Sequence, residues 1–192
     1  VVLKFQTEGF NPNYTDKNTI SSIILDNQSY KTYIQEITEM YFYGTGCGNQ
    51  DNCSLIENVF KSIFLNANII VTHDLMAACH ALFGNKEGIA CILGTGSHSC
   101  HYDGKEIINK AVSLGYIMGD EGSGNHIGKQ LLRDYCYKTM PTELSEKFEN
   151  EYDTEIPSII DNIYHKNQVS RYLASFSRFA YENKEHDYIK NL

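Results

Sequence analysis

The chain has 192 residues, of which 42% are hydrophobic, and 24 acidic against 16 basic side chains give it a net charge of −8. That length allows one large or two small domains with a real core, and the composition shows no sign of disorder. The acidic balance is shared evenly by the two halves, so neither carries the basic surface that duplex nucleic acid or an anionic membrane needs. No apolar run is long enough to span a bilayer.

Strands and helices are expected to alternate through residue 84. Apolar spacing and turn residues predict strands at 1–6, 39–43 and 68–71, and helices at 16–25, 29–37, 54–66 and 75–83. Loops rich in glycine or asparagine separate them at residues 7–13 and 44–48. Such alternation favours an α/β fold. We place a domain boundary in the polar stretch before Gly88, which gives domains at 1–85 and 86–192.

The second half is expected to open with a β-hairpin and to continue as helices. Ile89–Leu93 is an apolar strand, and the next strand, Ser97–Tyr102, closes on Asp103-Gly104, a strong hairpin turn signal. Residues 107–112 form a third strand or an irregular connection. Helices are predicted at 127–137, 142–151, 157–165 and 169–183.

The turn between the first two of these strands is the first candidate site. It reads Gly94-Thr95-Gly96-Ser97. Two residues without a Cβ let a ligand approach the backbone closely and make positive φ accessible, and successive N–H groups in such a turn can hold an anion. The two hydroxyls add donors. The turn therefore fits a phosphate site, although an ordinary glycine-rich hairpin without a ligand would have the same sequence pattern.

Asp74 is the candidate for proton transfer. It follows the apolar strand that ends at His73 and precedes a helix, and ligand sites in open α/β sheets gather at that edge. A carboxylate there can accept a proton from an attacking hydroxyl. Aspartate is also a favoured N-cap residue, so helix capping is an alternative role.

Two acids between three glycines form the most specific motif, Gly119-Asp120-Glu121-Gly122-Ser123-Gly124. Carboxylates accept paired hydrogen bonds, so the two acids suit the recognition of vicinal hydroxyls. Acids before a helix can also serve its dipole or its cap. Asn11 lies in an early loop, where it either contacts a ligand or forms an Asx turn.

Cysteine and histidine give no metal site. The six cysteines include no Cys-x-x-Cys pair, which indicates core thiols in a reducing, cytoplasmic protein. His98 and His101 are too few for zinc, which takes three or four protein ligands. The chain begins without Met inside a predicted strand, and we expect it to be a fragment of a longer protein.

Three motifs in order resemble a known family. Thr72–Ala78, Ile92–Ser97 and Leu114–Gly124 have the order and approximate spacing seen in N-acetylglucosamine kinases. These belong to the BadF/BadG/BcrA/BcrD-type ATPases of the actin-like sugar kinase and Hsp70 superfamily. The resemblance covers nearly the whole chain.

The resemblance implies two ribonuclease-H-like α/β domains that flank a cleft, the second with added helices. It implies transfer of a phosphoryl group from ATP to the 6-hydroxyl of an amino sugar, with N-acetylglucosamine as the favoured substrate. Mg²⁺ would bridge the phosphates. Asp74 would take the hydroxyl proton, and the turn Gly94, Thr95, Gly96 and Ser97 would hold phosphate. The residues that would contact the sugar are Asn11, His98, Gly115, Asp120 and Glu121. It leaves a homodimer open and implies no nucleic acid or membrane partner.

Departures from the family pattern keep other functions open. The family's first phosphate hairpin is expected upstream of Val1 and its adenosine motif beyond Leu192. His98 stands where an amino-sugar kinase usually has Asn, although its ring could still donate a hydrogen bond. The alternatives are an ATPase that activates a radical dehydratase through a cysteine-bound iron–sulfur cluster, and a sugar sensor without catalysis. A soluble α/β domain whose glycines and acids only form turns and caps is the simplest alternative.

Overall fold

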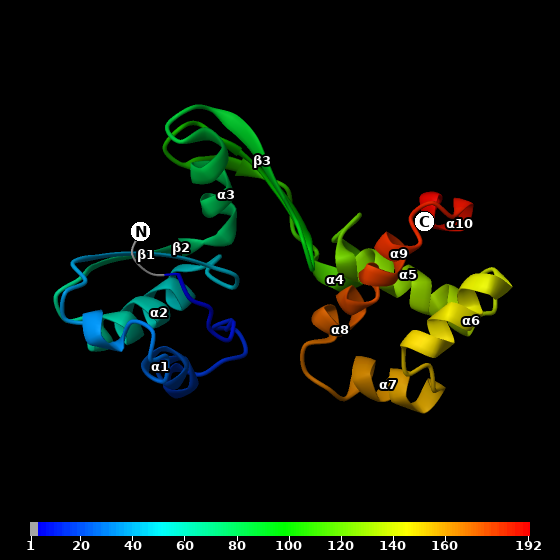
Figure 1. Ribbon diagram of the computed structural model, residues 1–192. Coiled ribbons are helices and arrows are strands. Elements are labelled where there is room, and N and C mark those ends of the chain that lie inside the picture. Colours follow the sequence, from blue (N-terminus) through cyan, green and yellow to red (C-terminus); the bar gives the residue numbers. More distant parts are fainter. Residues whose placement is uncertain (1–3) are drawn as a thin grey trace. The chain divides into compact units, whose positions relative to one another are not determined.

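A computed structural model describes residues 4–192, which form two compact units (Figure 1). The first unit holds residues 4–88 and Tyr102–Ile107, and the second holds Ile89–His101 and Ile108–Leu192. Residues 1–3 of the predicted first strand lie outside the described residues. Residues 4–6 are irregular, so that part of the strand prediction is wrong.

The first unit is built on two parallel strands. Its elements are α1 (Lys17–Leu25), the 3₁₀ turn η1 (Lys31–Tyr33), β1 (Glu39–Gly44), α2 (Gln50–Ile63), β2 (Asn68–His73) and α3 (Asp74–Phe83). The two strands pair in parallel from Glu39–Asn68 to Gly44–His73. Ile20, Ile56 and Phe60 form the centre of the core, and Phe60 packs edge-on against Phe42 of β1.

Two predicted helices of this unit need correction. Residues 29–37 contain only η1 and turns. The backbone there makes i→i+3 hydrogen bonds, such as the one from the Tyr33 N–H to the Tyr30 carbonyl at 2.8 Å, and its apolar residues reach the core from these turns. Helix α2 begins four residues earlier than the apolar pattern indicates and ends at Ile63. Its start is set by Asn49, whose side-chain oxygen accepts a hydrogen bond from the Asn52 N–H at 2.8 Å.

Replacing this cap should weaken the first unit. Asn49→Ala leaves the Asn52 N–H without its side-chain acceptor, and we expect a loss of about 1 kcal/mol in the free energy of unfolding. Urea unfolding followed by circular dichroism measures it. Gln50→Ala, at the adjacent exposed position, is the control and should change stability by less than about 0.5 kcal/mol. Equal losses in both variants would assign the effect to something other than the cap.

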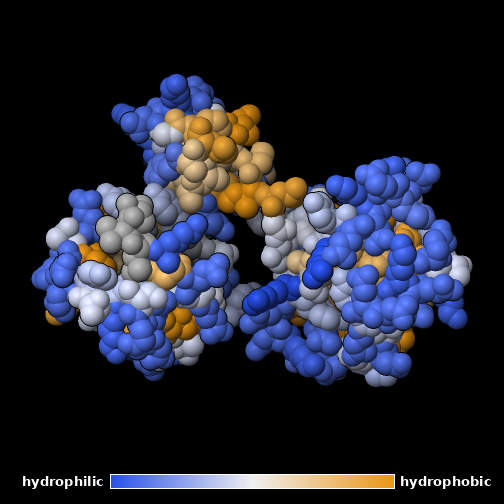
Figure 2. All heavy atoms as spheres, viewed as in Figure 1, coloured by the Kyte–Doolittle hydropathy of each residue, from blue (hydrophilic) through white to orange (hydrophobic). Residues whose placement is uncertain are grey.

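The second sheet has three strands in the order β3 (Gly88–Leu93), β4 (Ser97–Tyr102) and β5 (Ile107–Lys110). The predicted hairpin and third strand are confirmed. Asp103 accepts hydrogen bonds from the N–H groups of Lys105 and Glu106, both at 2.8 Å, and Gly104 takes a φ of 98° that favours glycine. Hydrophobic residues gather on the surface here (Figure 2), and Ile89 and Leu93 are each 70% exposed.

Helices form the rest of the second unit: α4 (Gly115–Met118), α5 (Gly124–Cys136), α6 (Thr142–Glu151), α7 (Ile156–Tyr164), α8 (Val169–Ser175), α9 (Ser177–Glu182) and α10 (Asp187–Lys190). Their core is aromatic, with Phe148 stacked near Phe176 and edge-on to Phe179. The single helix predicted at 169–183 is divided at Phe176, and α4 and α10 were not predicted.

Helices α5 and α8 pack closely against each other. A Cβ on Gly128 would lie 1.8 Å from the Leu173 carbonyl oxygen, so only glycine allows this approach. A Cβ on Gly124, the first residue of α5, would lie 3.2 Å from the Ala174 Cβ, so the start of α5 also packs against α8. The acid-rich motif, residues 119–124, ends at this point. The α/β class is confirmed, and the described residues show two small sheets rather than two complete domains. Among the described helices none has the length and apolar content that a membrane crossing requires.

Candidate functional site

In the first unit, parallel pairing places two candidate segments at one edge of the sheet. Gly44 and His73 pair at the carboxyl ends of β1 and β2, so the loop after Gly44 and the residue after His73 emerge side by side. Asp74 is the first residue of α3, while His73 holds the N-cap position. The Asp74 carboxylate is exposed and accepts a hydrogen bond from the Leu75 N–H at 2.9 Å. It thus satisfies one free N–H of the first helical turn and remains accessible.

The loop after β1 packs against the loop that holds Asn11. Asn11 makes the Asx turn, since its side-chain oxygen accepts a hydrogen bond from the Asn13 N–H at 3.0 Å. A Cβ on Gly46, whose φ is 81°, would lie 2.2 Å from that oxygen. Asn52 of α2 ties the loops together by donating to the Asn13 side-chain oxygen at 2.8 Å and to the Gly46 carbonyl at 2.6 Å. Neither Asn52 nor the role of Gly46 was found from the sequence, because both depend on contacts between loops.

Cys47 links this loop to Asp74. Its side chain is 2% exposed, and burial, together with the neighbouring Cys53 thiol and the charge of Asp74, raises the pKa of Cys47 to about 11. The Cys53 thiol donates to the Cys47 carbonyl at 3.3 Å. Asn11, the glycine-rich loop and Asp74 therefore surround one edge of the first unit.

The two kinds of thiol should react at different rates with iodoacetamide. Only a thiolate reacts, so Cys47, buried and with its pKa near 11, should remain unmodified at pH 7.5 while the exposed Cys91 is alkylated. As pH rises the thiolate fraction of Cys47 grows, so its labelling rate should increase with pH while burial keeps it below that of Cys91. Peptide mass spectrometry after timed labelling measures both rates. Labelling of Cys47 as fast as Cys91 at pH 7.5 would contradict its burial.

In the second unit, the glycine turn between β3 and β4 is closed by its own backbone. The Gly94 N–H donates to the Gly96 carbonyl at 2.9 Å. The first N–H groups of α5 then donate to the turn: Gly124 to the Gly94 carbonyl at 2.8 Å and Asn125 to the Thr95 carbonyl at 3.0 Å. The turn and the N-terminus of α5 are therefore one structure.

The glycines of the turn have different roles. A Cβ on Gly94 would meet no atom within 4 Å, so this side of the turn is open to a ligand. A Cβ on Gly96 would lie 2.9–3.0 Å from the Asp120 carboxylate, so Gly96 makes room for that acid. Neither glycine uses the positive φ that the sequence made accessible.

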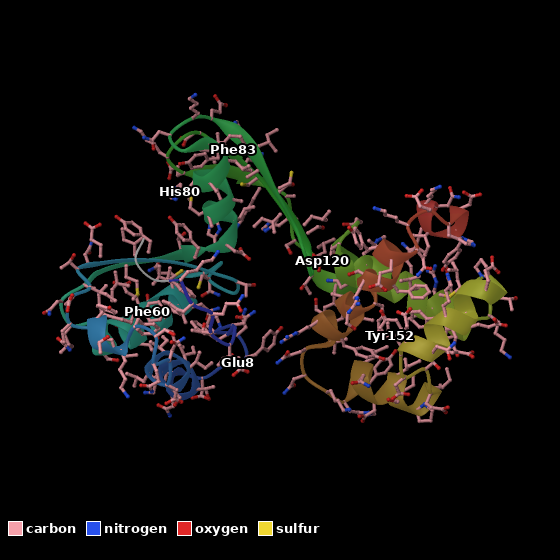
Figure 3. The ribbon with its side chains drawn as sticks, in the orientation of Figure 1. Glu8, Phe60, His80, Phe83, Asp120 and Tyr152 are labelled. Carbon is pink, nitrogen blue, oxygen red and sulfur yellow. The ribbon has the colours of Figure 1, made fainter. Side chains whose placement is uncertain are left out.

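Asp120 connects the acid-rich motif to the turn. Asp120, which is labelled in Figure 3, has a φ of 60°. One of its carboxylate oxygens accepts a hydrogen bond from the Ser97 N–H at 3.3 Å, and the other accepts one from the Asn125 side chain at 2.9 Å. Ser123 is the N-cap of α5, so the alternative that Asp120 or Glu121 caps this helix is wrong. Glu121 is exposed. Ser123 and Asn125, which are fully buried, were not singled out from the sequence.

A pocket of about 410 Å³ lies beside this connection. Ser97, His98, Asp120 and Glu121 line it, together with residues of β3, of the segment after β5 and Gly119. The lining contains no Lys or Arg. The His98 ring bonds through Nε2 to the Ala111 carbonyl at 3.0 Å. Gly115 lies outside the lining, at the start of α4 with a φ of 68°.

Comparison with known proteins identifies the family. No family model matches the chain. A solved structure from Porphyromonas gingivalis, described as a candidate N-acetylglucosamine kinase, superposes with a TM-score of 0.90 at 36% identity, over 97% of this chain and 67% of that one. The chain belongs to the N-acetylglucosamine kinase family. The resemblance inferred from the three motifs is thereby confirmed.

Two further relatives match this N-acetylglucosamine kinase family member less well, one over a shorter part of the chain and one at lower identity. An N-acetylmuramic acid/N-acetylglucosamine kinase from Clostridium acetobutylicum is 32% identical over 101 residues, which is 52% of this chain and 33% of that protein. A candidate N-acetylglucosamine kinase from Chromobacterium violaceum shares the fold alone, with a TM-score of 0.59 and 14% identity over 94% of this chain and 65% of that one. The chain spans about two thirds of the length of the solved relatives.

Proposed function

We propose that the protein is an ATP-dependent kinase that phosphorylates the 6-hydroxyl of a neutral amino sugar, N-acetylglucosamine. The observation that carries this proposal is the bond between the Ser97 N–H and the Asp120 carboxylate at 3.3 Å. It joins a glycine turn suited to phosphate with an acid loop suited to sugar hydroxyls. A phosphoryl transfer needs donor and acceptor held in contact, since most of its catalysis is positioning and charge stabilisation.

The charge of the pocket argues against an anionic substrate. Its lining offers the Asp120 and Glu121 carboxylates, with no Lys or Arg to offset an anion. Sugar hydroxyls donate to carboxylates, whereas the lactyl carboxylate of N-acetylmuramic acid would be repelled by them. The Clostridium acetobutylicum relative is named for both sugars. For this protein we therefore propose N-acetylglucosamine and not N-acetylmuramic acid.

The remaining roles follow the family resemblance. Asp74, exposed at the end of β2, would accept the 6-hydroxyl proton. The free N–H groups of the turn would be those of Thr95 and Gly96, because the Gly94 and Ser97 N–H groups are already bonded within the protein. Asn11, His98, Gly115 and Glu121 would contact the sugar or shape its loop.

Mg²⁺ would enter the site with the nucleotide. Within residues 4–192 no three side chains among His, Cys, Asp and Glu lie close enough to hold a metal by themselves. Mg²⁺ keeps several waters and binds through phosphates with one or two carboxylates, which matches this donor set. Bound with ATP, it would neutralise charge on the phosphates.

Some finer assignments belong to the same proposal. They are two ribonuclease-H-like domains divided near residue 86 and flanking a cleft, the BadF/BadG-type relationship, a cytoplasmic location and a homodimer. Activation of a dehydratase and catalytically silent sugar sensing are the competing functions, and both are outcomes of the experiment.

The proposal is tested by ADP release from the full-length protein with Mg-ATP. The sugars are N-acetylglucosamine, glucosamine, N-acetylmannosamine, glucose and N-acetylmuramic acid. We expect release that depends on N-acetylglucosamine and is absent with N-acetylmuramic acid. Release without sugar would favour the activator ATPase. Sugar binding in calorimetry without ATP binding or ADP release would favour the sensor.

A further inference from the structure

Asn125 is a polar side chain with no exposed surface, at the point where three parts of the second unit meet. Its backbone N–H donates to the Thr95 carbonyl of the glycine turn at 3.0 Å. Its side-chain N–H₂ donates to the Asp120 carboxylate at 2.9 Å and to the Ser170 hydroxyl of α8 at 3.1 Å. A buried amide is costly unless bonded, and here each donor has an acceptor.

The chemistry of the amide matches its partners. The side-chain oxygen accepts from the Ser123 hydroxyl at 3.3 Å, so both ends of the amide are engaged. Asp120 is an acceptor and therefore needs a donor opposite it. Only an amide of this length supplies two donors toward Asp120 and Ser170 together with an acceptor for Ser123. A carboxylate would oppose Asp120 with a like charge.

We propose that Asn125 is a positioning residue that holds the Asp120 carboxylate against the glycine turn. This inference rests on the proposed function for its kinetic consequence. Asn125 is buried and lies outside the pocket lining, so it acts through Asp120 and not on the sugar itself. Asp120 accepts one bond from Ser97 at 3.3 Å and a shorter one from Asn125, so losing the amide would free the acid to leave the turn.

The test is Asn125→Asp, which keeps the shape of the side chain and replaces the donor with a carboxylate. Near pH 8 two carboxylates would face each other, whereas at lower pH one would bind a proton and donate in place of the amide. Asn183→Asp is the matched control. The Asn183 amide donates to the Phe179 carbonyl at 3.0 Å and its oxygen accepts from the Lys147 ammonium at 3.1 Å, so Asn183→Asp also loses an amide donor but faces a cation instead of an acid. We divide the kcat/KM of each variant by that of the wild type at the same pH, which removes the effect of titratable groups that both proteins share.

We expect Asn125→Asp at pH 8 to lower kcat/KM for the sugar about tenfold or more, mainly through KM, and to regain at least about threefold of that deficit by pH 6. Asn183→Asp should follow the wild type at both values. A constant deficit at both pH values would reduce Asn125 to a packing role and overturn the proposal. Wild-type activity would likewise overturn it.

Unfolding gives a readout that does not depend on kinase activity. The free energy of unfolding of Asn125→Asp, relative to wild type, should increase as pH falls from 8 to 6, because the paired carboxyls in the folded state have a raised pKa and their proton is lost as pH rises. A relative stability independent of pH would contradict the contact with Asp120. If the wild type released no ADP with any sugar, the proposed function would fail while this measurement still decided the contact.

Discussion

Asp74→Asn should reduce ADP release by about 10²–10⁴-fold while leaving sugar affinity within about threefold of wild type. The amide keeps the size of the carboxylate and its bond from the Leu75 N–H at 2.9 Å, but it cannot accept the proton of the attacking hydroxyl. The side chain is exposed, so the fold should survive the change. Steady-state kinetics and calorimetry with N-acetylglucosamine measure the two quantities.

Asp26→Asn is the control for this variant. Asp26 is also an exposed acid of the first unit, but it lies at the C-terminal end of α1 and not at the carboxyl ends of the strands. It should turn over at the wild-type rate. Near-normal turnover in Asp74→Asn would remove Asp74 as the base, and a loss of sugar affinity equal to the loss of turnover would assign it to binding.

Gly128→Ala should cost about 3 kcal/mol or more of unfolding free energy. Alanine is favoured over glycine inside a helix by about 1 kcal/mol, so propensity alone predicts a gain. The added methyl, however, would lie 1.8 Å from the Leu173 carbonyl oxygen. That atom belongs to the backbone of α8 and moves only if α5 and α8 separate. Urea unfolding measures the change.

Gly48→Ala provides the control. A Cβ at Gly48 meets nothing within 4 Å, and no positive φ is required there. Its stability should stay within about 0.5 kcal/mol of wild type. Stability of Gly128→Ala at or above the wild-type value would show that α5 and α8 are not in contact at this residue.

Local sequence signals predicted most of the fold. Apolar spacing located α6 to the residue, and Asp103-Gly104 located the hairpin, because both features are decided within a few neighbouring residues. The failures came where distant packing decides. The apolar residues of 29–37 suit a helix, yet the chain there forms η1 and turns. Phe176 continues the helical pattern but ends α8, with its ring buried beside Phe148.

The sequence indicated which residues belong to the candidate site but not which of them contact each other. Asp120 was found from its glycine neighbours, but its bond to the Ser97 N–H joins residues 23 positions apart and leaves no local signal. Asn125 reads as an ordinary polar residue near a helix start, and only its burial reveals its partners. The N-cap of α5 is Ser123. This serine lies within the motif, but by sequence the two acids before it suited the cap of the helix equally well.

The bond between His98 and Ala111 determines what the imidazole ring can offer a ligand. A carbonyl oxygen only accepts, so the neutral ring must carry its proton on Nε2, and Nδ1 is left as an acceptor. An asparagine in the same place would present both a donor and an acceptor. The neutral His98 can therefore receive a hydrogen bond from a sugar hydroxyl but cannot give one to an acetyl carbonyl, and a second donor arises only when the ring is protonated.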